Sequence, residues 1–312
     1  MTMREPQLVS VAAPMHDEEG TVAAFYERVK AALGEAPFEL VIADDGSRDG
    51  TPAALAELAS RDERIKLVTL ARNFGHQAAL TAALEHARGD VVVMMDGDLQ
   101  DPPEVIPEML DRWRGGSDVV YAVRTRREGE TAFKRRTASS FYRLFRWLAD
   151  IDLPPDAGDF RLMDRRPLDA MLAMPERNRF LRGMSVWVGF NQTAVTFERE
   201  ARTAGRTKYT LRRMVRFSFD AITSFSHRPL QFATLLGFMF SLLAFLAIPL
   251  TVVARYTNIY ERGVPTTIVI VLLLGGIQLI CVGIIGEYVG RIYDEVKHRP
   301  LYVVRKKANL DK

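Results

Sequence analysis

The sequence predicts an α/β domain built on a mostly parallel sheet, followed by two helices that cross a membrane. Short apolar runs alternate with amphipathic helical stretches over residues 8–123, and most of these runs end at polar or acidic residues. Two uncharged stretches, residues 232–254 and 264–286, come later in the chain. Each is longer than the roughly 20 residues that a helix needs to cross the hydrocarbon core of a bilayer.

Five apolar runs are the candidate strands, and they are residues 8–13, 38–43, 65–70, 91–95 and 118–123. Amphipathic stretches such as 21–33 and 77–87 separate them. Strands that are apolar throughout and alternate with helices indicate a parallel sheet that is covered on both faces. Ligands bind such a sheet beyond the carboxyl ends of its strands. The residues that follow each strand are therefore the candidates for a functional site.

Polar or acidic segments follow the first four strands, and we expect them to meet at one edge of the sheet. They are residues 14–19, 44–52, 72–76 and 96–101. None has the glycine pattern of a dinucleotide-binding loop or of a P-loop, which excludes nicotinamide enzymes and P-loop NTPases. The second segment also predicts a helix start with Thr51 as the cap and Pro52 at the first position. That role does not require the two carboxylates that precede it.

After the fourth strand, two carboxylates and an amide lie within five positions, at Asp96, Asp98 and Gln100. A buried strand that ends in carboxylates is costly unless a positive charge lies there. Carboxylate and amide oxygens suit Mg²⁺ or Mn²⁺, which proteins hold with one or two carboxylates and the phosphates of the substrate. The sequence therefore predicts a divalent cation that holds a pyrophosphate.

The distribution of Lys and Arg predicts the orientation in the membrane. Basic residues precede the first apolar stretch and follow the second, whereas the connection 255–263 holds Arg255 and Arg262 against Glu261. By the positive-inside rule, both termini and the soluble domain face the cytoplasm. We therefore expect a multi-pass protein of the inner (plasma) membrane. The N-terminus has no apolar h-region, so we expect no cleaved signal peptide. The single cysteine, Cys281, lies in the second stretch, where we expect it to serve packing.

The expected organisation has four parts: a catalytic domain 1–210, a juxtamembrane helix 211–229, a membrane hairpin within 230–287 and a cytoplasmic tail 288–312. Within the domain, residues 133–149 place apolar side chains at helical spacing with basic residues around them, and 211–225 is similar. Basic amphipathic helices rich in aromatic residues lie in the membrane interface. The alternative for each segment is a core helix with a solvated basic face.

At this point the residues resemble a known family. The segments "VAAPMHDEEG", "VIADDGSRDGT", "LARNFGHQAAL" and "MMDGDLQDPPE" are similar to successive signatures of the family 2 inverting glycosyltransferases with the GT-A fold. More narrowly, they resemble the polyprenyl-phosphate glycosyltransferases, which include bactoprenol glucosyltransferases and the dolichol-phosphate mannosyltransferase group. Matches continue in "AGDFRLMDR", "RFLRGMSVWVGF", "RTAGRTKYTLRRM" and "GEYVGRIYDEVKHRP". The resemblance therefore covers nearly the whole chain. The chain departs from the pattern at His16, Asp17, Gly97 and Thr207.

The resemblance implies three groups of site residues. The nucleotide-sugar pocket would be lined by Pro14, Glu18, Asp44, Asp45, Asn73 and Asp96. The metal would be held by Asp96, Asp98 and Gln100. The catalytic group would be Asp98, Asp159 near the acceptor side of the sugar, and the phosphate-directed pair Arg206 and Lys208.

The implied reaction is transfer of a hexose from a nucleotide sugar to a polyprenyl phosphate with inversion. Glucose from UDP-glucose and undecaprenyl phosphate is the preferred pair, giving a lipid-linked sugar for cell-envelope glycosylation. Because the acceptor phosphate is already ionised near neutral pH, we expect Asp159 to orient a substrate rather than to take a proton. The alternatives are a GDP-mannose-dependent mannosyltransferase, a processive polysaccharide synthase and an inactive membrane scaffold. We expect no nucleic-acid partner, and glycines of the second span allow a homo-oligomer.

Overall fold

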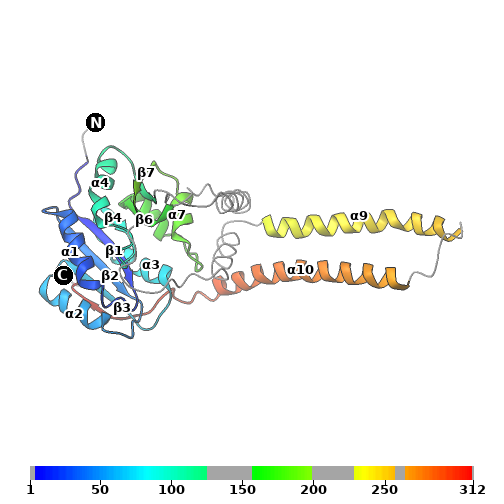
Figure 1. Cartoon of the computed structure of the whole chain (residues 1–312), viewed down its shortest axis with the longest axis horizontal. Coiled ribbons are helices and arrows are strands. Elements are labelled where there is room, and N and C mark those ends of the chain that lie inside the picture. The colour runs from blue at the N-terminus through cyan, green and yellow to red at the C-terminus, as the bar shows by residue number, and fades with distance from the viewer. Residues whose placement is uncertain (1–3, 125–156, 199–227, 257–263, 311–312) are drawn as a thin grey trace. The chain divides into compact units, whose positions relative to one another are not determined.

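The structure is a computed structural model, and it describes residues 4–124, 157–198, 228–256 and 264–310 (Figure 1). The chain divides into two compact units. The first contains residues 1–143, 151–214 and 300–312, and the second contains 144–150 and 215–299. Arg206, Lys208, the predicted interface helix 133–149 and residues 211–227 of the predicted juxtamembrane helix lie outside the described residues.

An eight-stranded sheet forms the centre of the first unit, in the order β7-β5-β6-β4-β1-β2-β3-β8. Its strands are β1 Val9–Met15, β2 Phe38–Asp44, β3 Ile65–Leu70, β4 Val91–Met94, β5 Val119–Arg124, β6 Ala157–Asp164, β7 Gln192–Phe197 and β8 Val304–Ala308. The pairs β1–β2, β2–β3, β1–β4 and β5–β7 are parallel, whereas β6 and β8 run antiparallel to their neighbours. The predicted mostly parallel α/β fold is confirmed.

Helices cover the sheet. They are α1 Val22–Leu33, α2 Thr51–Arg61, α3 His76–His86, α4 Ile106–Arg114, which follows the short 3-10 helix η1 Pro103–Val105, α6 Arg165–Leu172 and α7 Leu181–Trp187. Residues of α1, α2 and α4 share one core with β1, β2 and β4. The buried residues of α3 are outside that core, and this helix contacts β1 and β2.

The strand order reverses next to β1. The chain builds β1, β2 and β3 outward in one direction, and α3 then returns it to β4 on the other side of β1. Such a reversal opens a crevice at the carboxyl ends of the two central strands, where doubly wound sheets bind their ligands. The loops after β1 and β4 carry Glu18 and Asp96, so the topology directs attention to these two loops.

All five strands expected from the sequence are present, with bounds that shift by a residue or two. The sequence analysis gave no strand to β6, β7 or β8. β7 alternates between buried and exposed positions and β8 is mostly exposed. Neither has the continuous apolar run that marks the central parallel strands.

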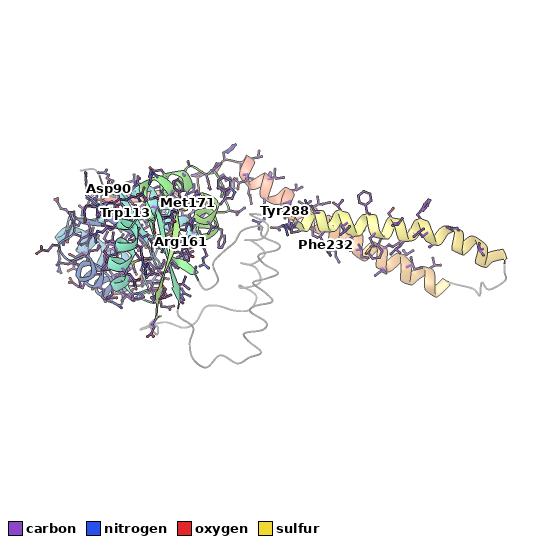
Figure 2. The ribbon with its side chains drawn as sticks, turned by 90° about the horizontal axis from the view of Figure 1, so that it is seen from above. Asp90, Trp113, Arg161, Met171, Phe232 and Tyr288 are labelled. Atoms are coloured by element: carbon purple, nitrogen blue, oxygen red, sulfur yellow. The ribbon has the colours of Figure 1, made fainter. Side chains whose placement is uncertain are left out.

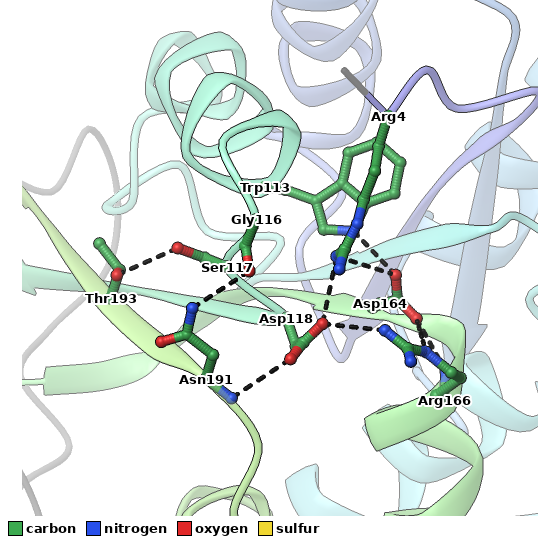
Figure 3. Close-up of polar contacts among 9 residues, drawn as sticks. All are labelled: Arg4, Trp113, Gly116, Ser117, Asp118, Asp164, Arg166, Asn191 and Thr193. Atoms are coloured by element: carbon green, nitrogen blue, oxygen red, sulfur yellow. Dashed lines mark hydrogen bonds and ion pairs between the residues drawn. The ribbon is translucent and has the colours of Figure 1, made fainter. Parts of the chain in front are cut away.

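A polar network lies where β5 begins and β6 ends (Figure 3). The Asp118 carboxylate accepts a hydrogen bond from Arg4 at 3.1 Å and one from Arg166 at 3.0 Å. Trp113 Nε1 donates to Asp164 Oδ2 at 3.0 Å. These contacts join the N-terminal segment, α4 and the ends of β5 and β6. The hydrogen bonds with Trp113 and Arg166 outweigh the effect of burial and lower the pKa of Asp164.

The second unit contains the helices α9 Arg228–Tyr256 and α10 Val264–Val296. Both are long and apolar enough to cross a membrane, and the apolar windows are 6% and 0% buried within the protein. Exposed side chains such as Phe232 on α9, at 53%, would be costly in water (Figure 2). The helices contact each other where the Cys281 thiol meets Ala233 O at 3.7 Å. The two predicted apolar helices are therefore present.

The glycines of α10 do not take part in this contact. A Cβ atom at Gly275, Gly276, Gly283 or Gly286 would meet nothing within 4 Å. A homo-oligomer that uses this surface stays a prediction.

The residues after α10 return to the sheet as its edge strand. β8 pairs antiparallel with β3, with Leu67 opposite Ala308. Asn309 Nδ2 donates to Ala59 O at 2.6 Å and to Ile65 O at 3.0 Å, and Leu310 is 6% exposed. The C-terminal segment, expected to be a cytoplasmic tail, therefore contributes a strand to the sheet of the first unit.

Candidate active site

Two carboxylates face each other at the carboxyl edge of the sheet because β6 runs antiparallel to β4. The last ladder pair of these strands is Met94 with Arg161. If this antiparallel register is continued by two residues, Asp96, which follows β4, lies opposite Asp159 of β6. These residues are far apart in the sequence, and the antiparallel pairing brings them into one site.

The carboxylate of Asp159 is held by donors from two other elements. Gln77 Nε2, on the first turn of α3, donates to Asp159 Oδ2 at 3.2 Å. Arg182 Nε, on α7, donates to Asp159 Oδ1 at 3.3 Å. Gln77 also accepts the backbone N–H of Leu181 at 3.0 Å. One glutamine therefore fixes the carboxylate and the start of the helix that supplies the arginine.

His76 lies between the two carboxylates. Its Nε2 atom is 3.4 Å from Asp96 Oδ1 and 3.5 Å from Asp159 Oδ2. Gly75, which precedes the helix, has φ 101°, a conformation that favours glycine and turns the chain into α3 at this point. The imidazole is 44% exposed, so it is accessible to a ligand.

The pKa values of these groups follow from burial and from their mutual charges. Burial raises the pKa of Asp96 to about 6, with His76 opposing and the carboxylates of Asp159, Asp101 and Asp98 adding to the rise. Burial would lower the pKa of His76, but the hydrogen bond with Asp159 and the nearby carboxylates raise it to about 9. For Asp159, burial is outweighed by Arg182, His76 and Arg161, which hold its pKa well below its usual range.

Arg161 supplies a further positive charge beneath the site. Its side chain is 2% exposed, and it donates to Gly158 O at 2.8 Å and to Arg182 O at 3.3 Å, with a further contact to Ser185 (Figure 2). Burial lowers its pKa to about 10, so it stays charged at neutral pH. The guanidinium therefore ties β6 to α7 and keeps Arg182 beside Asp159.

The loop after β2 and the loop after β3 are joined through Asp45. Its carboxylate accepts the backbone N–H groups of Phe74 at 2.6 Å and Gly75 at 2.9 Å. Gly46, at φ 64°, lies in the loop after β2. It is so close to the loop after β3 that a Cβ atom would be 2.5 Å from the carbonyl carbon of Arg72. Because both oxygens of Asp45 serve the backbone, its first role is to position the loop that leads to His76.

Asp44 is placed differently from its neighbour. Its Oδ1 atom accepts the backbone N–H of Ser47 at 3.0 Å, and its buried Oδ2 atom has no hydrogen-bond partner among the described residues. A buried oxygen without a donor is costly. It is therefore the better candidate of the two for a ligand hydroxyl or amine.

Glu18 and Pro14 border the same crevice from β1. Thr21 Oγ1 donates to Glu18 O at 3.0 Å and to Gly97 O at 3.3 Å, which joins the loops after β1 and β4. A Cβ atom at Gly97 would lie 2.8 Å from the Met15 side chain and 3.2 Å from Pro14 O. The glycine between the two aspartates therefore permits a close approach of the β4 loop to β1.

Asp98 and Gln100 form a turn in the β4 loop. Asp98 Oδ1 accepts the backbone N–H of Gln100 at 3.1 Å, and Leu99 between them has φ 59°. Gln100 is 6% exposed and Asp101, with Arg124 3.6 Å away, is 2% exposed. The loop thus holds three acidic side chains within six residues of chain.

The residues present fit a divalent cation. Asp96 Oδ1 is buried and has no hydrogen bond among the described residues, and burial raises the pKa of Asp96, with the carboxylates of Asp159, Asp101 and Asp98 adding to the rise. Hard oxygen ligands of this kind suit Mg²⁺ or Mn²⁺. Within the described part of the chain, no group of three or more His, Cys, Asp or Glu side chains gathers as a complete metal site. A cation bound here would therefore need ligands from its substrate.

The structure brings together Asp96 and Asp159, and the loops that carry Glu18, Asp44 and Asp45 follow β1 and β2 at the same carboxyl edge of the sheet. Asn73 lies in the exposed loop after β3. The sequence analysis assigned no role to His76, Gln77, Arg182 or Arg161. All four lie in segments that carry the family resemblance, but single polar residues within such segments are not distinctive. The sequence signal that could have found them was their position after β3 and within the segment "RFLRGM".

This mostly parallel sheet, with paired carboxylates at the reversal of strand order, defines an enzyme of the GT-A type. A family model described as glycosyl transferase family 2 matches residues 10–172. The chain belongs to glycosyl transferase family 2, and it is a glycosyltransferase.

Relatives extend this similarity beyond the family model. An uncharacterised glycosyltransferase of Bacillus subtilis, YkcC, is 46% identical over 97% of this chain and 94% of its own length. The SfII prophage-derived bactoprenol glucosyl transferase of Shigella flexneri is 38% identical over 96% of this chain and 97% of its own length. Among solved structures, glucosyl-3-phosphoglycerate synthase from Mycobacterium tuberculosis is 20% identical, covers 70% of this chain and 76% of its own, and has a TM-score of 0.49.

Proposed function

We propose that the protein transfers glucose from UDP-glucose to a polyprenyl phosphate, of which undecaprenyl phosphate is the preferred candidate. The observation that carries this proposal is the 38% identity with bactoprenol glucosyl transferases over 96% of the chain, because that similarity extends through α9 and α10. The product is a lipid-linked glucose, formed with inversion at the sugar. Such a lipid is a donor for glycosylation in the cell envelope.

Asp96, Asp98 and Gln100 would hold a Mg²⁺ or Mn²⁺ ion together with the diphosphate of the donor. A divalent metal acts as a Lewis acid that stabilises the charge developing on a nucleoside diphosphate leaving group. The buried Oδ1 atom of Asp96 and its raised pKa support this assignment. Pro14, Glu18, Asp44, Asp45 and Asn73 would border the nucleotide. In this arrangement the carboxyl ends of β1, β2, β3 and β4 form the donor side of the site.

Asp159 serves the acceptor side. Arg182 and Gln77 hold its carboxylate, and the low pKa of this group makes it a weak base. A phosphate acceptor is already ionised near neutral pH, so a weak base suffices. Asp159 therefore orients the sugar or the acceptor. Arg206 and Lys208 would contact phosphate, where the fork of an arginine can bind two oxygens.

A membrane location supports a lipid acceptor. Both α9 and α10 are long and apolar enough to span a bilayer. The chain enters α9 from the catalytic domain and, after α10, returns to that domain as β8. Both outer ends of the hairpin are thus connected to one domain, so they lie on one side of the membrane. By the positive-inside rule, that side is the cytoplasmic side of the inner membrane.

The test is incubation of the purified full-length protein with undecaprenyl phosphate and, separately, UDP-glucose, UDP-N-acetylglucosamine or GDP-mannose. Lipid-linked sugar is followed by mass spectrometry with Mn²⁺, with Mg²⁺ and with excess chelator. We expect glucosyl lipid from UDP-glucose with either metal and none with chelator. The anomeric configuration of the product, read by NMR, should be opposite to that of the donor.

Other outcomes of this test are equally informative. Mannosyl lipid from GDP-mannose would identify the mannosyltransferase alternative. A polymer longer than one sugar would identify a processive synthase. Absence of product with every donor, while free UDP-glucose still binds, would contradict the polyprenyl phosphate acceptor.

A further inference from the structure

The His76 side chain contacts both the carboxylate that follows β4 and a carboxylate near the start of β6. Its Nε2 atom lies 3.4 Å from Asp96 Oδ1 and 3.5 Å from Asp159 Oδ2. Its position as the first residue of α3, with Gly75 at φ 101° before it, fixes the imidazole at this place. The donor side and the acceptor side of the site therefore meet at one residue.

The two carboxylates depend on His76 to different degrees. Asp159 has Gln77 and Arg182 as further donors, at 3.2 Å and 3.3 Å. Asp96 Oδ1 is buried and accepts no hydrogen bond from the described residues, and the His76 imidazole 3.4 Å away is the neighbour that a cation would have to displace. Without the imidazole, Asp159 would keep its two other donors, Gln77 and Arg182. Asp96 would then bind a cation without having to give up the contact with His76.

We propose that His76 is a positioning residue that competes with the donor's metal ion for the Asp96 carboxylate. When the donor binds, His76 loses its contact with Asp96 and keeps its contact with Asp159. In the nucleotide-free protein, His76 is shared between the two carboxylates. On donor binding, Asp96 exchanges this contact for the cation, and His76 then holds Asp159 alone. The orientation of Asp159 toward the acceptor thereby depends on an occupied donor side. This inference rests on the proposed function, because it takes the donor to be a metal-bound nucleotide.

The proposal predicts effects of opposite sign on binding and on turnover. Removing the imidazole removes a competitor for Asp96, so the affinity for a metal–nucleotide complex should increase. The same change leaves Asp159 with fewer donors, so transfer should slow. A residue that contacted the donor directly would instead weaken nucleotide binding when removed. A residue with a purely structural role would lower the midpoint of thermal unfolding and impair binding and turnover together.

The experiment compares wild type, His76→Ala and His76→Gln as full-length protein in nanodiscs. Binding of UDP with Mn²⁺ is measured by calorimetry, and bound Mn²⁺ by electron paramagnetic resonance. For His76→Ala we expect the Kd of UDP–Mn²⁺ to fall three- to tenfold and kcat to fall at least tenfold, with no rise in KM for the donor. For His76→Gln, whose amide can still donate to a carboxylate, we expect intermediate values.

His86→Ala is the matched control on the same helix. His86 is the last residue of α3, and its Nδ1 atom contacts Ala82 O at 2.7 Å, away from both carboxylates. We expect its UDP–Mn²⁺ affinity and its kcat to match those of wild type. If His76→Ala proves unstable, His76→Gln alone still tests the direction of the binding change.

The readouts separate this inference from the proposed function. A weaker or unchanged affinity of His76→Ala and His76→Gln for UDP–Mn²⁺ would overturn the inference, even if wild type glucosylates undecaprenyl phosphate. Absence of UDP–Mn²⁺ binding to wild type would overturn it as well. Tighter binding in His76→Ala, together with no lipid product from wild type, would support the competition at Asp96 and contradict the assigned acceptor.

Discussion

Asp159 shows how neighbouring residues decide the role of a carboxylate. The guanidinium of Arg182, the imidazole of His76 and the amide of Gln77 all lie within 3.5 Å of its oxygens. Positive neighbours favour the ionised form, which makes Asp159 a weaker base than an ordinary aspartate. For Asp96, by contrast, burial raises the pKa, and the neighbouring carboxylates add to the rise. This difference supports the proposal that Asp159 orients a substrate and that Asp96 binds a metal ion.

The first prediction concerns Asp98. We expect Asp98→Ala to lower metal-dependent transfer by about 10²-fold or more, because the transition state loses a group that helps hold the cation. Product formation with Mn²⁺ is the measurement, together with the midpoint of thermal unfolding. The midpoint should change little, since the substitution removes a local hydrogen bond, the one that the Asp98 carboxylate accepts from the backbone of Gln100 within the turn.

Asp111→Ala is the control for this change. Asp111 lies on α4, is 71% exposed and pairs with Arg114. An exposed pair of this kind contributes roughly 0–1 kcal/mol, so activity and stability should stay at wild-type values. Full activity of Asp98→Ala would remove this residue from the metal site.

The second prediction concerns pH and Asp62. Arg64 donates hydrogen bonds to its carboxylate and lowers its pKa well below the usual range, despite burial, and Tyr26 adds another donor. A group whose pKa is lowered on folding stabilises the folded state above its unfolded pKa and loses this effect as the pH falls. We expect Asp62→Asn to cost about 2 kcal/mol near neutral pH.

The measurement is the unfolding free energy of wild type and Asp62→Asn between pH 3 and pH 8. The difference should be constant from about pH 5 to pH 8 and should shrink below about pH 4, where the carboxylate of the unfolded chain becomes protonated. A difference that grew on acidification would show that the ion pair does not stabilise the fold.

At the scale of elements, β6 has the largest consequence for the site. Its direction, opposite to that of β4, places its first residues beside the last residues of β4. A parallel β6 would place Asp159 at the other end of the sheet. β8 affects the stability of the sheet. It covers the edge of β3, and its backbone forms hydrogen bonds with the backbone of β3. An uncovered edge strand is prone to pairing with other chains.

The third prediction concerns the attachment of β8. We expect Asn309→Ala to destabilise the protein by about 2 kcal/mol, because Ala59 O and Ile65 O lose their donor. Asn309 also has φ 59°, which asparagine adopts more readily than alanine. The midpoint of thermal unfolding should fall by about 4–8 °C for a domain of this size.

Lys306→Ala is the control within the same strand, since its side chain is exposed. It should leave the midpoint unchanged. Equal stability of Asn309→Ala and Lys306→Ala would mean that the end of the chain is not anchored through this asparagine.

At the scale of the whole molecule, the chain connects one domain to both outer ends of a hairpin. Residues 151–214 and 300–312 belong to one compact unit, whereas α9 and α10 between them belong to the other. If α9 and α10 cross a bilayer, we expect both outer ends of the hairpin to lie on one side of it. This arrangement agrees with the proposed acceptor, whose lipid part stays in the membrane.

The fourth prediction tests this topology. In a Cys281→Ser background, single cysteines replace Asn258, between the two helices, and Lys306, in β8. A membrane-impermeant maleimide added to spheroplasts should label position 258 at once and position 306 after the membrane is permeabilised. Labelling of position 306 in intact spheroplasts would contradict the cytoplasmic assignment.

The sequence determined the features that depend on local pattern. Continuous apolar runs specified β1 to β5, the acidic residues after them specified the functional edge, and two long uncharged stretches specified α9 and α10. Each of these features depends on which neighbouring residues are buried. The spacing of apolar residues along the sequence indicates this directly. Asp96 and Asp98 were found in this way, and Asp159 through resemblance of its segment.

The tertiary structure decided what depends on pairing between distant segments. The pairing of β6 with β4 brought Asp159 to Asp96, and the pairing of β8 with β3 returned the chain end to the domain. His76, Gln77, Arg182 and Arg161 acquired their roles from that convergence. Strand direction and register arise from the packing of the whole sheet, and no local window of sequence contains them.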